Sequence, residues 1–172
     1  MDLGLEGKVA IVTGGSDGIG KAAAISMALE GAKVAIVGRT QTKLDAAVAE
    51  IKEASGGEAI GISADVSVES DVKAMVNKVV AEYGKLDILV NNAGTSSATT
   101  LENMTDEDLK VDFGIKVYGA VYCARAALPH LKKSGAGAIV NTTTPGGKAP
   151  NPGGQPTSLS RAAGISLTKS WA

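Results

Sequence analysis

The chain has a single cysteine, Cys123, among its 172 residues, and few aromatic side chains. One thiol excludes an internal disulfide and a thiolate metal cluster, and it suits a reducing compartment, so we expect a cytoplasmic protein. No apolar run is long enough to span a bilayer, and the N-terminal MDLGLEGK lacks the layout of a signal peptide. A formal net charge of −1 gives no bulk attraction to nucleic acid or to an anionic membrane, so neither partner is expected. No spacing of His, Cys and carboxylate residues indicates a metal site.

Glycine, by contrast, is abundant, and its most informative occurrence is the stretch KVAIVTGGSDGIG, from Lys8 to Gly20. An apolar run, Val9–Val12, enters a glycine turn, and a helical run of small residues, Ile19–Leu29, follows at once. Such a turn leaves free N–H groups at the positive end of a helix, where a pyrophosphate can bind. Because a strand precedes the glycines and a helix follows them, the pattern predicts a dinucleotide-binding site.

Short β-type runs alternate with helical patterns along the whole chain. The strands are nearly continuous apolar runs, which indicates a parallel sheet covered on both faces. We therefore predict an α/β fold, a single Rossmann-type domain over residues 1–172 with a doubly wound, mostly parallel sheet and helices on both faces. The predicted strands are Val9–Val12, Val34–Val37, Ala59–Ser63, Ile88–Val90 and Ala138–Asn141.

The second half carries weaker signals. Thr105 with Asp108 predicts a capping box that opens a long helical region ending near His130. Four of the five prolines lie in a predicted loop, Thr144–Pro156, and a final helix is predicted over Ser158–Ala172.

The last predicted strand lies at one edge of a sheet in doubly wound order. Its outer side is then an unpaired apolar edge, which proteins usually cover. Either more chain follows Ala172 or another chain covers this edge. Of the two we expect the first, a fold truncated after the helix that follows the fifth strand.

Four motifs lie at the ends of the predicted strands and in the long helix: Thr13-Gly14-x-x-x-Gly18-Ile19-Gly20, Asp65-Val66, Asn91-Asn92-Ala93-Gly94, and Gly119 within KVYGAVYCARAALPHL. Together they resemble the short-chain dehydrogenase/reductase family over essentially the whole chain. The resemblance implies that Asp65 contacts the adenine and that the Asn92 segment lines the cofactor cleft. The cofactor-binding residues that we predict are Gly14, Ser16, Asp17, Gly18, Ile19, Gly20, Arg39, Asp65, Val66, Asn92, Ala93, Gly94 and Arg161.

The residues at the end of the second strand indicate which of the two nicotinamide dinucleotides is preferred. NAD binders place an acidic residue there to hold the ribose hydroxyls, whereas this chain has Gly38-Arg39. A guanidinium can hold a 2′-phosphate through two parallel hydrogen bonds, so we predict NADP(H) over NAD(H). Asp17 stands where NADP-preferring relatives often carry a base.

Aligning VNTTTPGG and TSLSRAAGISLTKS with the family locates its Asn, Ser, Tyr and Lys tetrad at Lys116, Thr144, Thr157 and Arg161. All four residues differ from the family pattern. Thr144 keeps a hydroxyl and Arg161 keeps a positive charge that can bind ribose hydroxyls. Thr157 is the severe change, because an aliphatic hydroxyl titrates far above a phenol and is a poor acid or base near neutrality. Lys116 puts a cation where a neutral amide supports a water chain.

Three functions stay open at this point. The first is an NADP-dependent oxidoreductase of the family, acting on a carbonyl or alcohol with weak activity. The second is a non-catalytic dinucleotide-binding pseudoenzyme with a binding or regulatory role. The third is a lyase resembling the halohydrin dehalogenases, although those relatives keep the serine and tyrosine and lose the nucleotide turn.

The resemblance also implies a homo-oligomer that pairs through the long helix and the final helix. It leaves the small-molecule substrate unidentified, because in this family the substrate is set largely by C-terminal segments that this chain lacks.

Overall fold

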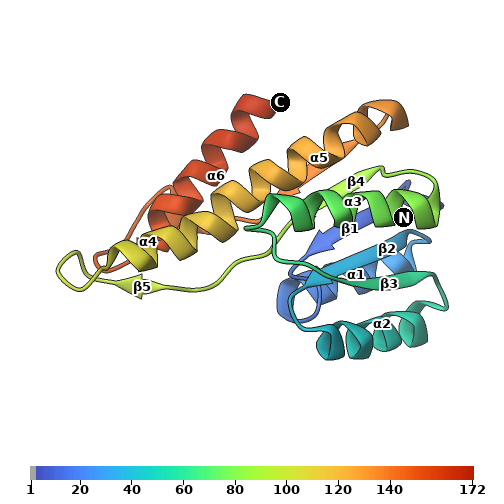
Figure 1. Cartoon of the computed structure of the whole chain (residues 1–172), viewed down its shortest axis with the longest axis horizontal. Coiled ribbons are helices and arrows are strands. Elements are labelled where there is room, and N and C mark those ends of the chain that lie inside the picture. The colour runs from blue at the N-terminus through green and yellow to red at the C-terminus, as the bar shows by residue number, and fades with distance from the viewer. Residues whose placement is uncertain (1–2) are drawn as a thin grey trace.

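The computed structural model describes residues 3–172, which form a five-stranded sheet between helices (Figure 1). No helix in this described part is both long and apolar enough to cross a membrane. The strands are β1 (Val9–Thr13), β2 (Lys33–Gly38), β3 (Ala59–Ser63), β4 (Ile88–Asn91), β5 (Ala98–Thr99), β6 (Ala138–Asn141) and β7 (Gln155–Pro156). The helices are α1 (Gly18–Leu29), α2 (Gln41–Ser55), α3 (Glu69–Tyr83), α4 (Asp106–Phe113), α5 (Gly119–Ser134) and α6 (Thr157–Trp171), with a π turn η1 (Gly114–Tyr118) and a 3-10 turn η2 (Pro145–Gly147).

The main sheet is parallel throughout, in the order β3-β2-β1-β4-β6. This is the predicted doubly wound order, and all five predicted strands lie within one or two residues of their expected bounds. The chain crosses from β3 on one side of β1 to β4 on the other, so a topological switch point lies between β1 and β4. As predicted, β6 is an edge strand, and Val140 on it is 52% exposed.

Two apolar layers cover the sheet, because successive strand side chains point to opposite faces. Val9 and Ile11 of β1 face one layer, which α3 and α5 complete. Val12 faces the other layer, which α1 and α2 complete. All three of these β1 side chains are fully buried, so the strand that carries the glycine turn is held from both sides.

The long helical region begins as predicted, with a reciprocal capping box between Thr105 and Asp108. It differs from prediction in two respects. A π turn interrupts it, in which the N–H of Gly119 donates to the carbonyl of Gly114. The helix also continues past His130 to Ser134, because Pro129 is accommodated within α5 and the chain leaves the helix only at Gly135, in a left-handed conformation with φ of 74°.

The proline-rich loop is also more ordered than predicted. It contains η2 and the short strand β7, which pairs antiparallel with β5 through Ala98–Pro156 and Thr99–Gln155. These two strands lie at the end of the molecule with α4, away from the main sheet (Figure 1). Helix α6 then starts at Thr157, so this residue lies in its first turn.

Candidate active site

A cleft of about 480 Å³ opens where the strands end at their carboxyl termini. The glycine turn and α1 form one side, and the loop after β6 with the start of α6 forms the other. Ligands of doubly wound folds bind at this edge, next to the switch point. The predicted site residues that line it are Gly14, Ser16, Asp17, Gly18, Ile19, Asn92, Gly94, Thr144, Thr157 and Arg161.

The glycine turn is braced by the loop after β4. The Asn92 side-chain amide donates to the carbonyl oxygens of Thr13 and Gly14, at 3.0 and 3.2 Å. The Thr13 hydroxyl accepts from the N–H groups of Asn92 and Ala93, both at 3.0 Å. Gly14 has a φ of 64°, and a Cβ on Gly20 would lie 2.2 Å from the Gly14 carbonyl oxygen. The turn therefore requires glycine at both positions.

A second recess of about 220 Å³ adjoins this cleft beyond the end of β2. Arg39 lines it as predicted, together with a second cation that the sequence reasoning did not single out, Lys43 in the first turn of α2. Lys43 lies four residues after Arg39, which was the signal available in the sequence. The predicted residues Ser16, Asp65, Val66, Ala93 and Gly94 also line this recess.

The Asp65 carboxylate is held in place at the far wall of this recess. It accepts hydrogen bonds from the Ser67 hydroxyl at 2.6 Å and the Ser67 N–H at 2.9 Å. These bonds, with the nearby charge of Arg39, hold the pKa of Asp65 below its usual value, against the opposing effect of burial. Asp65 therefore lines the recess as a fixed carboxylate.

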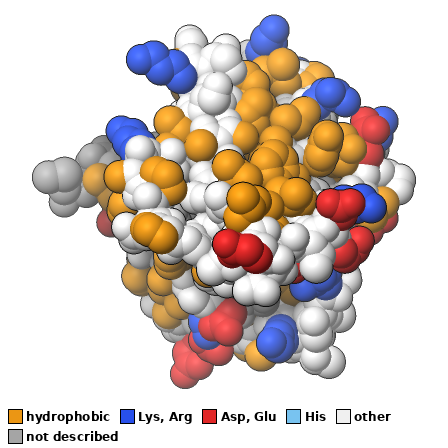
Figure 2. Space-filling model, turned by 90° about the vertical axis from the view of Figure 1, so that its left-hand side faces the viewer, with side chains coloured by type: hydrophobic (Ala, Val, Ile, Leu, Met, Phe, Trp, Pro, Cys, Tyr) orange, Lys and Arg blue, Asp and Glu red, His pale blue; other side chains and the backbone are white. Residues whose placement is uncertain are grey.

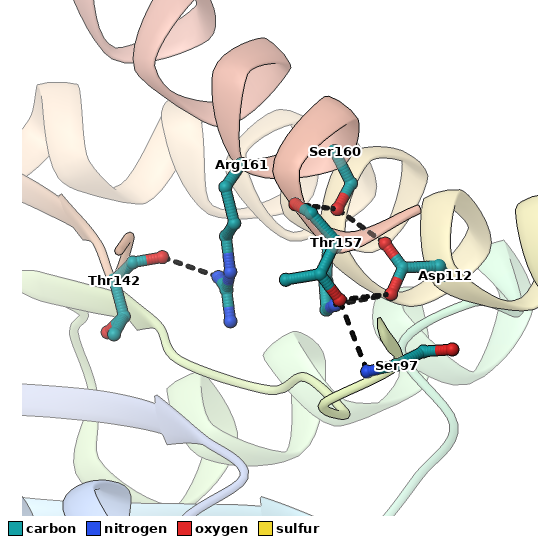
Figure 3. Close-up of polar contacts among 7 residues, drawn as sticks. Ser97, Asp112, Thr142, Thr157, Ser160 and Arg161 are labelled. Carbon is teal, nitrogen blue, oxygen red and sulfur yellow. Dashed lines mark hydrogen bonds and ion pairs between the residues drawn. The ribbon is translucent and has the colours of Figure 1, made fainter. Parts of the chain in front are cut away.

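Behind the cleft lies a cluster of four polar side chains from α4, η1 and α6, which we call the polar cluster: Asp112, Lys116, Thr157 and Ser160 (Figure 3). Lys116 Nζ forms a close ion pair with Asp112 Oδ2 and donates to Thr157 Oγ1 at 2.8 Å. Ser160 Oγ donates to Asp112 Oδ1. Sequence reasoning missed Asp112 and Ser160. The four-residue spacing of Asp112 and Lys116 within a helix was the available signal.

The side chains of both charged members are buried, with exposed fractions of 0% for Lys116 and 1% for Asp112. Burial lowers the pKa of Lys116, and the nearby Arg161 charge acts in the same direction. The hydrogen bond and charge of Asp112 act in the opposite direction and do not fully cancel the effect of burial.

The other two predicted tetrad positions are placed differently. Arg161 projects from α6 and donates from Nη1 to the Thr142 carbonyl at 2.5 Å (Figure 3). Its Nε is buried and has no hydrogen-bond partner among residues 3–172. Thr144 is exposed at the rim of the cleft. The structure thus joins Lys116 to Thr157 and leaves Thr144 apart from both.

The residues present fit a dinucleotide. The glycine turn has no room for a Cβ at Gly20. The cations Arg39 and Lys43 and the Asp65 carboxylate line the recess beside it. The buried Nε of Arg161 has no acceptor among residues 3–172. Within residues 3–172, no three His, Cys, Asp or Glu side chains come together as metal ligands. Cys123 is buried in α5, and burial raises the pKa of its thiol to about 12, so it is not a nucleophile.

The fold and this cleft define a dinucleotide-binding protein of the doubly wound α/β class. The family model of the short chain dehydrogenases matches residues 8–172. The chain belongs to the short chain dehydrogenase family.

Its relatives are oxidoreductases. The chain is 37% identical over 169 residues to a 3-oxoacyl-[acyl-carrier-protein] reductase of Synechocystis, covering 98% of this chain and 68% of the relative. An uncharacterized oxidoreductase of Thermotoga maritima is 39% identical over 170 residues, covering 99% and 66%.

Solved structures agree with this assignment. L-sorbose reductase of Gluconobacter frateurii, complexed with NADPH and L-sorbose, superposes with a TM-score of 0.95 at 35% identity, covering 99% of this chain and 65% of that one. NAD+-bound xylitol dehydrogenase gives 0.93 at 33% identity, covering 98% and 65%. The chain therefore spans about two thirds of the length of the relatives it matches.

Proposed function

We propose that the protein binds NADP(H) and catalyses slow hydride transfer between this cofactor and a carbonyl or alcohol. The observation that carries the proposal is the pairing of an intact glycine cradle with a cleft that holds Thr157 and Arg161. The bound dinucleotide would supply the hydride. Arg39 and Lys43 would hold the 2′-phosphate, and Arg161 would hold ribose hydroxyls.

Preference for NADP(H) rests on charge. Arg39 and Lys43 line one recess, and the end of β2 carries no carboxylate that would repel a 2′-phosphate. Among the relatives, the sorbose reductase structure holds NADPH and the xylitol dehydrogenase structure holds NAD+, so the family fold accepts either. The prediction of NADP(H) over NAD(H) therefore rests on the side chains of this recess.

Slow turnover follows from the side chain at position 157. An aliphatic hydroxyl replaces the phenol that the family resemblance implies there, and positioned acid–base groups contribute about 10² to 10⁴ in rate. We expect turnover at least ~100-fold below that of a relative with a phenol at this position.

A binding titration with NADPH and NADH, followed by a screen of carbonyl substrates on the longest available form of the chain, tests the proposal. Tighter binding of NADPH with slow ketone reduction supports it. Binding without turnover of any substrate would identify a non-catalytic dinucleotide-binding protein instead. No binding of either dinucleotide would reject both functions.

We also propose that two copies of the chain pair through the long helix and α6. Apolar side chains are exposed on both elements. On the long helix, formed by α4, η1 and α5, the exposed fractions are 47% for Val111, 56% for Tyr118 and 44% for Leu128. On α6, Leu159 is 43% exposed. Apolar side chains also gather on the face of the molecule at the α4 end (Figure 2). Sedimentation of the wild-type chain and of Val111→Glu should distinguish a dimer from a monomer. A monomeric wild type contradicts the pairing.

A further inference from the structure

One hydroxyl connects the buried ion pair to the cleft. Lys116 Nζ has two hydrogen-bond partners among residues 3–172, Asp112 Oδ2 and Thr157 Oγ1. The Lys116 and Asp112 side chains are buried, whereas Thr157 lines the cleft. The ammonium group therefore reaches the cleft through the Thr157 hydroxyl.

The hydrogen bonds of Thr157 orient it as a proton donor. Its Oγ1 accepts from Lys116 Nζ at 2.8 Å and from the Ser97 N–H at 3.2 Å. A hydroxyl has two acceptor lone pairs and one proton, so both lone pairs are occupied and the proton is left to give. Asp112 Oδ2, at 3.2 Å, accepts that proton in this structure, so in the relay a substrate oxygen takes the place of Asp112 as the acceptor.

We propose that Thr157 is a proton relay, which passes a proton from the Lys116 ammonium to the oxygen of a carbonyl compound bound in the cleft. This inference rests on the proposed reductase function. Position 157 is that of the family's tyrosine, and the inference is that a threonine hydroxyl there transfers a proton it receives from Lys116, which stands at the asparagine position.

The carbonyl carbon receives a hydride, with its two electrons, from a reduced nicotinamide dinucleotide, and the C–O π bond breaks toward oxygen. That oxygen takes the Thr157 proton while Thr157 Oγ1 takes a proton from Lys116, which becomes a neutral amine. After the alcohol leaves, water in the cleft returns one proton to Lys116 through the same hydroxyl.

A relay overcomes the weakness of an aliphatic alcohol as an acid. Thr157 gives one proton as it receives another, so it need not exist as an alkoxide, although two linked transfers remain slower than direct transfer from a phenol. The same hydrogen bonds argue against a nucleophilic threonine, because a nucleophile needs a free lone pair and both are engaged by donors.

The groups that face Lys116 are suited to proton release. Asp112 on α4 balances the ammonium charge, and Ser160 on α6 holds the other carboxylate oxygen. Burial lowers the pKa of Lys116, Asp112 opposes this effect, and the charge of Arg161, which projects from α6, adds a smaller lowering. Asp112 and Ser160 are positioning residues, since neither lines the cleft.

The first test needs no cofactor. In protein with ¹⁵N-labelled lysine, NMR measures how fast the Lys116 ammonium hydrogens exchange with water. Thr157→Val keeps the shape of the side chain and removes the hydroxyl, while Thr157→Ser keeps the hydroxyl. Without the relay, exchange must wait for a local opening, so Thr157→Val should slow it by at least about tenfold. Thr157→Ser should stay close to wild type. Unchanged exchange in Thr157→Val would overturn the relay.

The second test measures turnover with NADPH and a carbonyl substrate. Thr157→Val should lose at least about tenfold in kcat, whereas Thr157→Ser, which keeps the hydroxyl, should lose much less. Full activity in Thr157→Val, or a wild type that binds NADPH without turnover, would overturn the catalytic use of the relay. If wild type binds no dinucleotide, the proposed function fails, and the exchange measurement decides on the proton path by itself.

Discussion

The side-chain amide of Asn92 donates to the carbonyl oxygen of Gly14 at 3.2 Å, which ties the loop after β4 to the glycine turn after β1. The two segments are 78 residues apart in the chain and meet because β1 and β4 are neighbours in the sheet. The shape of the dinucleotide cradle therefore depends on tertiary pairing as well as on the glycines themselves.

Gly20→Ala should abolish dinucleotide binding. The new Cβ would lie 2.2 Å from the Gly14 carbonyl oxygen and 2.5 Å from Asn92 Nδ2, so the turn must shift. Gly164→Ala in α6 is the matched control, because a Cβ there meets nothing within 4 Å. It should raise the free energy of unfolding by about 0.5–1 kcal/mol, as replacing a helical glycine does. Fluorescence titration with NADPH and urea unfolding provide the two measurements, and wild-type affinity in Gly20→Ala would contradict the cradle.

Arg39→Asp should weaken NADPH binding by at least about tenfold more than NADH binding, because it replaces a phosphate-binding cation by a repelling carboxylate. Lys78→Asp makes the same change of charge on the exposed surface of α3 and serves as the control. Isothermal titration with both cofactors measures the ratio. Equal losses for the two cofactors in Arg39→Asp would remove Arg39 from the phosphate site.

Removing one partner of the Asp112–Lys116 ion pair should lower the free energy of unfolding more than replacing both partners does. Lys116→Met leaves a buried carboxylate without its counter-ion, so the free energy of unfolding should fall by about 3–5 kcal/mol. The double variant Asp112→Leu with Lys116→Met buries no charge and should lose much less than the sum of the two single changes. Urea denaturation of the four proteins measures this coupling, and simple additivity would show that the pair does not act as a unit.

Asp87 should make the fold sensitive to acid. Its buried carboxylate accepts from the Val9 N–H at 2.9 Å and from the Ser134 hydroxyl, and Lys85 lies 3.0 Å away. Burial by itself would raise the pKa of Asp87, but these hydrogen bonds and the Lys85 charge outweigh it and lower the value. The stabilisation is therefore complete above the unfolded pKa of about 3.9 and is lost as the pH falls through the folded value.

The measurement is urea unfolding of wild type and Asp87→Asn at pH 7 and again below pH 4. At pH 7 the variant should be less stable by about 1–3 kcal/mol, and the difference should shrink in acid. Asp106→Asn, the same substitution at an exposed position in the first turn of α4, is the control. A difference between wild type and Asp87→Asn that does not change with pH would mean that the Asp87 charge plays no part.

Much of the fold could be predicted from local sequence. The five strands of the main sheet, their order and the Thr105 capping box follow from short-range patterns of apolar residues and polar caps. The end of α5 and the β5–β7 pair could not be predicted, since Pro129 is tolerated by its surroundings and two-residue strands carry no periodicity.

The candidate site divides in the same way. The glycine turn, Arg39 and Asp65 are recognisable because their positions follow strand ends. Asp112 was missed because a carboxylate in the middle of a helix normally faces solvent, and only the packing of α6 buries it against Ser160. The sequence does not show a partner for the Thr157 hydroxyl, because its contact with Lys116 joins residues 41 positions apart.

The π turn between α4 and α5 also affects how this region tolerates changes in chain length. A turn that holds one residue more than an α-helical turn rotates everything after it by about 100° relative to everything before it, at 3.6 residues per turn. Deleting a single residue from Gly114–Tyr118 would allow an ordinary helix to form. The apolar stripe of α5 would then rotate off the sheet, or Asp112 would rotate away from α6.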